Sequence, residues 1–167
     1  MMARQSVSPE PQIQAARLGW ARRRSSPDSV LAEHYERVHT VIRCVRLFTG
    51  ADEQSHVQIG HIDLARGRND DLVSSAIAST RVTVEETASG GALAWHTAPV
   101  RQLVVTLTGT LLFITRDGEE FTLAPGDVLL AEDTTGSGHQ WKLVGDDPWR
   151  RIYIVLAEGA DVPFIAD

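Results

Sequence analysis

The sequence predicts an all-β domain, and three observations support this prediction. Between residues 41 and 156, short segments alternate apolar and polar residues with the period of two that is typical of β-strands. Turn residues separate these segments, among them Asp117-Gly118 and Ala124-Pro125-Gly126. The chain has 167 residues, of which 43% are hydrophobic, and this is enough for one core of ordinary size. An antiparallel sandwich or barrel satisfies all three observations.

Two parts of the chain differ in composition. Residues 1–29 are rich in Arg, Ser, Pro and Gln and contain few large apolar side chains. We therefore expect residues 1–39 to form an N-terminal extension that is poorly ordered or contains a short helix. Leu31, Tyr35 and Val38 recur at helical spacing, with Ser29 as a candidate N-cap for that helix. Residues 40–167 are expected to form the β-domain.

Nine short strands are expected in the β-domain. Asp117-Gly118 is the strongest hairpin signal, because a type I′ turn needs positive φ at both central residues and these two residue types tolerate it. No Gly-rich phosphate loop and no nucleophile elbow accompany the strands. The expected strands are 41–48, 56–64, 81–87, 102–107, 111–115, 119–123, 128–131, 139–144 and 151–156.

Charge and cysteine content exclude several classes of partner. Residues 1–50 hold eight arginines and four acidic residues, whereas the remainder holds eight basic and eighteen acidic residues. The main body therefore lacks the clustered cations that nucleic-acid binding requires. No apolar run is long enough to span a bilayer, so no membrane association is expected. Cys44 is the single cysteine, and no secretory signal is recognised, so we expect a cytoplasmic protein, although residues 1–27 overlap in composition with transit peptides.

Strand parity selects the candidate site residues. Residues an even number apart on one strand point to the same face of the sheet. If one strand runs unbroken through Pro99, His96 and Gln102 share a face, and on a later strand His139 and Trp141 share a face. If both faces line the barrel interior, two imidazoles and an amide meet there. These are groups that bind transition metals.

Two stretches of the chain are AWHTAPVRQLVVTLTG, residues 94–109, and DGEEFTLAPGDVLLAEDTTGSGH, residues 117–139. They resemble the two characteristic motifs of the cupins, a family of small antiparallel β-barrels of the jelly-roll type. The combination W-H-x-A-P-x-R-Q and E-D-T-T-G-x-G-H also looks like an uncharacterised bacterial subgroup of that family. The resemblance covers approximately residues 41–157. It implies a cupin-type jelly-roll barrel for residues 40–167.

The same resemblance implies a metal site. A metal-dependent cupin typically offers three histidines and one glutamate, and His96 and His139 match two of the histidines. Ala98 replaces the third histidine and Gln102 replaces the acid, which lowers the expected affinity because an amide carries no charge. The implied ion is a divalent metal such as zinc, iron or manganese, held by His96, His139 and Gln102 and completed by His56 or, next, by Asp133. The alternative is a hydrogen-bonded histidine pair in a barrel that has lost its metal.

Three further residues have both a functional and an ordinary interpretation. Arg101 forms an ion pair or, near a pocket mouth, clamps a carboxylate substrate. Asp133 lies in a loop, where it contacts ligand or caps a turn through backbone amides. Trp141 is a flat wall of a ligand pocket or an ordinary core residue.

Two functions remain open at this point. The first is a cupin that binds a small polar or carboxylated molecule in its barrel, as a metal-dependent enzyme of the oxygenase, isomerase or lyase type. The second is a metal-free, non-catalytic module for binding or sensing a small molecule, which the missing histidine and glutamate favour. The resemblance also implies a homodimer, because small cupins commonly pair.

Overall fold

The computed structural model describes residues 41–167, and the predicted N-terminal extension lies outside them. The described residues form strands and no helix, so the prediction of an all-β jelly-roll barrel is confirmed. None of these residues belongs to a helix long and apolar enough to cross a membrane. The strands are β1 (Arg43–Thr49), β2 (Ser55–Ile62), β3 (Ala65–Arg66), β4 (Leu72–Val73), β5 (Ser79–Thr87), β6 (Ala92–His96), β7 (Gln102–Thr108), β8 (Thr110–Thr115), β9 (Glu120–Leu123), β10 (Val128–Glu132), β11 (His139–Val144), β12 (Trp149–Leu156) and β13 (Phe164–Ala166).

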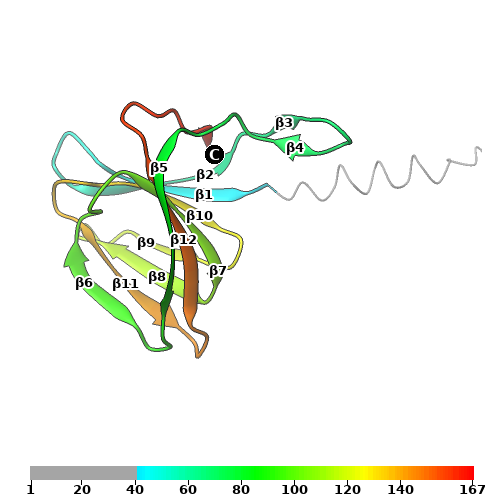
Figure 1. The fold of residues 1–167 in the computed structure, drawn as a ribbon. Coiled ribbons are helices and arrows are strands. Elements are labelled where there is room, and N and C mark those ends of the chain that lie inside the picture. The colour runs from blue at the N-terminus through cyan, green and yellow to red at the C-terminus, as the bar shows by residue number, and fades with distance from the viewer. Residues whose placement is uncertain (1–40) are drawn as a thin grey trace, which may run out of the picture. The chain divides into compact units, whose positions relative to one another are not determined.

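Two sheets make up the barrel (Figure 1). The larger sheet has seven strands in the order β13-β2-β1-β10-β7-β12-β5, and the smaller has four in the order β6-β11-β8-β9. The short β3–β4 hairpin projects away from both (Figure 1). Strands far apart in the sequence thus become neighbours, and one of these pairs, β1 with β10, is parallel. The other strand pairs of the described chain are antiparallel, so the expectation of a purely antiparallel barrel is corrected at this one pair.

The core lies between the two sheets and follows the predicted alternation. On β11, His139, Trp141 and Leu143 are buried, whereas Lys142 is exposed. The larger sheet is apolar on its outer face as well, where Cys44 is fully buried. The inner core consists of Val45, Leu47, Ala98, Val104, Leu111, Phe113, Phe121, Leu123, Leu129, Ala131, Trp141, Leu143 and Trp149.

The condition for His96 and Gln102 to share a face, one strand running unbroken through Pro99, is not met. Strand β6 ends at His96 and belongs to the smaller sheet, whereas β7 begins at Gln102 and belongs to the larger. Proline has no backbone N–H to donate to a strand ladder, so the chain leaves one sheet at Pro99 and enters the other. His96 and Gln102 therefore reach the barrel interior from opposite sheets. Strands β3, β4, β6 and β13 were not predicted.

The predicted hairpin at Asp117-Gly118 forms, but with a different turn. Gly118 has φ 91°, whereas Asp117 is not among the residues with positive φ. The amide of Gly118 donates to the carbonyl of Thr115, and the amide of Thr115 donates to the carbonyl of Glu119. This pattern is a three-residue loop with its last residue in the left-handed region. It joins β8 to β9.

Candidate functional site

A cavity of about 410 Å³ opens between the two sheets. One wall comes from the smaller sheet and the β6–β7 connection, and the other comes from β5, β7, β10 and β12. Most of the lining is apolar or aromatic, with a few convergent polar groups, which is the usual character of a small-molecule site. The polar and charged lining residues are Arg81, Thr83, Glu85, His96, Thr97, Gln102, His139 and Tyr153.

Two imidazoles meet in this cavity. His96 on β6 lies directly opposite His139 on β11 in the strand ladder, and their ring centroids are 4.3 Å apart. Nδ1 of His96 is 2.7 Å from the carbonyl oxygen of Ala94 and donates to it. Nδ1 of His139 is likewise engaged, 2.6 Å from Oδ2 of Asp133. Because both Nδ1 atoms are occupied, Nε2 of each ring is the nitrogen available to a ligand or a proton.

Asp133 holds His139 from behind. Its side chain is fully buried, and its Oδ2 also accepts a hydrogen bond of 3.1 Å from the hydroxyl of Ser55 on β2. The backbone continues this attachment, since the amide of Ala98 donates to the carbonyl of Asp133. Carboxylates behind histidines fix the ring orientation and raise the basicity of the remaining nitrogen. Asp133 is thus a positioning residue beneath the cavity, and it is not among the residues that line the cavity.

The second oxygen of Asp133 has no hydrogen-bond partner within the described residues. A buried carboxylate is costly unless a positive charge or further hydrogen bonds compensate it. His139 can connect the negative charge of Asp133 to the cavity, because its imidazole contacts Asp133 and also lines the cavity. A cation bound at Nε2 of His139 would supply the missing positive charge. This local charge balance favours a cation at the histidine pair.

His96 and Gln102 complete the possible donor set. Burial lowers the pKa of the His96 imidazole, and the neighbouring His139 lowers that pKa further. A neutral imidazole with a free nitrogen is the form that binds metal or accepts a proton. Gln102 is buried and lines the cavity from β7, and its side chain makes no hydrogen bond among those of the described residues. Two nitrogen donors and one amide therefore face the same cavity, which fits a transition metal in donor type.

The wall formed by β5 and β12 holds charged residues that the sequence did not single out. Arg81 lines the cavity and forms no ion pair within the described chain. Glu85, on the same face of β5, is instead paired with Arg151 at 3.1 Å. Arg151 also stacks 3.9 Å above the Trp149 ring. The alternation in residues 81–87 was visible in the sequence, but the order of the strands decides which face meets the cavity.

The other predicted site residues separate into two groups. Trp141 lines the cavity with its ring 4.9 Å from that of Trp149, so it forms part of the wall. Arg101 pairs with Glu132 at 2.5 Å and donates to the carbonyl of Ala160, on the outer side of the larger sheet. His56 does not line the cavity either; its Nε2 contacts Oδ1 of Asp52 at 2.9 Å. Neither Arg101 nor His56 therefore joins the histidine pair.

No family model matches the chain. No curated protein matches it. A solved structure that is similar to it is that of an uncharacterized conserved protein with a double-stranded beta-helix domain from Klebsiella pneumoniae subsp. pneumoniae MGH 78578. The two chains share 20% identity over 62% of this chain and 86% of that chain, with a TM-score of 0.39.

Proposed function

We propose that the barrel binds a small polar or carboxylated molecule beside a divalent metal held by His96 and His139. The observation that carries this proposal is the pair of imidazoles whose Nδ1 atoms are engaged and whose Nε2 atoms are free in one cavity. Gln102 is the third donor. Asp133 supplies the buried negative charge behind the pair.

The donor chemistry favours a metal that accepts nitrogen ligands. Imidazole suits zinc and iron, whereas carboxylate-rich sites suit manganese and magnesium. A metal bound there would act as a Lewis acid that polarises an oxygen of the substrate. The chain's own contribution is to orient two nitrogens, to restrict water with the Phe113 and Trp141 side chains, and to provide Asp133 as the support of His139. These roles suit oxygenase, isomerase or lyase chemistry alike.

Arg81 supports a carboxylated ligand. Arg81 lines the cavity and has no carboxylate partner among the described residues, unlike Arg151. Arginine presents a planar set of donors that matches a carboxylate. A ligand whose anionic group meets Arg81, and whose other polar group faces the histidine pair, would use both walls of the cavity. The apolar lining between them would hold a short hydrocarbon portion.

A metal-free binding module is the alternative, favoured by a specific observation. The cavity offers Ala98 and Gln102 where an acid or a further histidine would strengthen metal binding. In that case the protein binds its ligand without metal and without catalysis. Both functions use the same residues. They differ in whether the isolated protein binds metal.

Calorimetric titration of zinc into chelator-treated protein tests the proposal. The wild type is expected to bind zinc, and the His96→Ala, His139→Ala double variant is expected to lose one equivalent. His61→Ala is the matched control, because His61 is a partly exposed histidine paired with Asp167 and remote from the cavity lining. Equal stoichiometry in the wild type and the double variant would reject the metal site and leave the metal-free module.

A further inference from the structure

We propose a second divalent-metal site on the surface, formed by His56, Asp117 and Glu119. The three residues offer ligand atoms that all lie within 4.8 Å of one another. None of them lines the barrel cavity. The site is therefore separate from the histidine pair, and the proposal does not depend on the proposed function.

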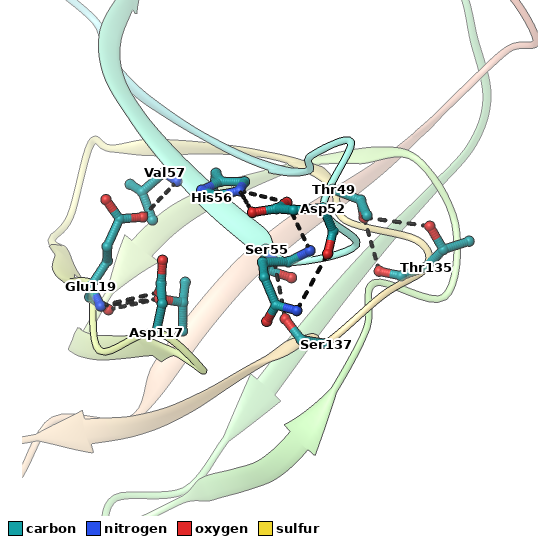
Figure 2. A network of polar contacts seen from close by, with 11 residues as sticks. Thr49, Asp52, Ser55, His56, Val57, Asp117, Glu119, Thr135 and Ser137 are labelled. Carbon is teal, nitrogen blue, oxygen red and sulfur yellow. Dashed lines mark hydrogen bonds and ion pairs between the residues drawn. The ribbon is translucent and has the colours of Figure 1, made fainter.

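The site joins two parts of the chain that are distant in sequence. His56 lies on β2, immediately after the β1–β2 loop, whereas Asp117 and Glu119 lie in the turn between β8 and β9. Figure 2 shows the two carboxylates on the same side of the His56 ring. Strands β2 and β8 belong to different sheets, so an ion bound here would connect the sheets at one end of the barrel.

The His56 ring is held in place before any ion binds. Its Nε2 lies 2.9 and 3.1 Å from the two carboxylate oxygens of Asp52, which leaves Nδ1 as the nitrogen for a metal (Figure 2). Gly50 lies against the ring so closely that a Cβ there would be 2.5 Å from Cδ2 of His56. The Phe48 ring lies on another side, with centroids 5.8 Å apart. A carboxylate behind a ligating histidine is the usual arrangement in metal sites.

Each of the two carboxylates is anchored through one oxygen and has the other available. Oδ1 of Asp117 accepts a hydrogen bond from the hydroxyl of Thr115. Oε2 of Glu119 accepts one from the backbone amide of Val57 at 3.2 Å (Figure 2). Oδ2 of Asp117 and Oε1 of Glu119 accept no hydrogen bond from the described residues. The anchored oxygens limit the directions that the free ones can take. This arrangement lowers the entropic cost of binding an ion.

The charge around His56 is strongly negative. Asp52, Asp117 and Glu119 surround one imidazole, and neither Asp117 nor Glu119 pairs with a lysine or arginine in the described chain. A divalent cation would neutralise part of this charge. One imidazole and two carboxylates form a mixed nitrogen and oxygen set that suits zinc, iron or manganese. Solvent would occupy the remaining coordination positions, because both carboxylates are exposed.

The direct test is a zinc titration by calorimetry on the full chain carrying His96→Ala and His139→Ala, which removes the barrel pair. One equivalent of zinc is expected to remain. Adding Asp117→Asn and Glu119→Gln is expected to abolish that equivalent, whereas adding His61→Ala is expected to leave it unchanged. Asp52→Asn, which removes only the carboxylate behind His56, is expected to lower the zinc affinity of the surface site by about ten- to a hundredfold.

A second arm uses the barrel with its histidines intact, in case the double variant does not fold. There the Asp117→Asn, Glu119→Gln variant is expected to bind one zinc fewer than the wild type, and zinc is expected to raise its melting temperature less. Identical stoichiometry and identical zinc-dependent melting of this variant and the wild type would overturn the surface site. A loss of bound zinc in the His96→Ala, His139→Ala variant concerns only the site in the barrel. The two proposals can therefore fail independently of each other.

Discussion

Asp133 is the residue on which the geometry of the histidine pair depends most. Replacing Asp133 with Asn keeps the shape but removes the charge that supports His139. We expect the affinity for zinc in the barrel to fall about ten- to a hundredfold, as for other carboxylates behind ligating histidines. Competition with a chromophoric chelator measures this affinity. Ser55→Ala is the control, because it removes the weaker contact to the same oxygen, and it should change the affinity less.

Cys44 gives a pH-dependent prediction at the same scale. Burial, with a smaller contribution from the nearby Glu132 and against an opposing hydrogen bond from the Leu130 backbone, raises the pKa of its thiol to about 12. In the unfolded chain the thiol ionises near pH 8.5. The stability that comes from the neutral buried thiol is therefore complete below about pH 8.5 and is lost as the pH rises toward 12. Unfolding by urea should show a falling free energy of unfolding over this range, and Cys44→Ala should show a smaller fall.

The sequence predicted the barrel residues only in part. His96 and His139 were found because a motif and strand parity agree on them, and Trp141 followed from the parity of His139. Asp133 is predicted in a loop as a ligand contact or a turn cap, whereas its side chain is fully buried and contacts His139 instead. Arg81 was missed because the sequence shows that β5 alternates but does not show which of its faces meets the cavity. Such information depends on contacts between distant strands.

At the scale of elements, the turn before β11 lies against the backbone of His96 at the end of β6. Gly138 has φ 73°, and a Cβ there would collide with the carbonyl group of His96. Gly145, in the turn after β11, has φ 83° and open space around it. Both positions carry the backbone cost of an L-residue in the left-handed region, about 1–2 kcal/mol. In Gly138→Ala, the added Cβ would also collide with the carbonyl group of His96.

We therefore expect Gly145→Ala to lower stability while leaving zinc binding in the barrel intact. Gly138→Ala is expected to lower stability more and to weaken zinc binding, because relief of the collision moves β6 away from β11. Chemical unfolding and zinc titration on the two variants measure the two effects. Equal zinc affinity in both variants would mean that the turn does not position the pair.

Most strands were predictable because alternation is a local property. The nine expected segments all became strands, with ends displaced by a few residues. The short strands β3, β4, β6 and β13 lack a periodic signal of sufficient length. The parallel pairing of β1 with β10 joins residues more than eighty positions apart, and no local pattern encodes it.

At the scale of the whole molecule, the homodimer stays a prediction. Strand β5 lies at the edge of the seven-stranded sheet and has nine residues, with Val82 and Val84 exposed to 58% and 73%. Long apolar edge strands tend to pair with another chain. We expect Val84→Asp to shift the protein from dimer to monomer in analytical ultracentrifugation. A wild-type monomer at micromolar concentration, or a variant that remains a dimer, would contradict the use of this edge.

The central claim is that the barrel holds a metal between His96 and His139. Elemental mass spectrometry on protein purified without a histidine tag or chelator tests it most directly, beside His96→Ala, His139→Ala and, separately, His56→Ala. The account predicts that the barrel variant holds one metal per chain fewer than the wild type, and that His56→Ala retains the metal of the barrel. A wild-type protein without metal, or equal metal content in the wild type and the barrel variant, would contradict it.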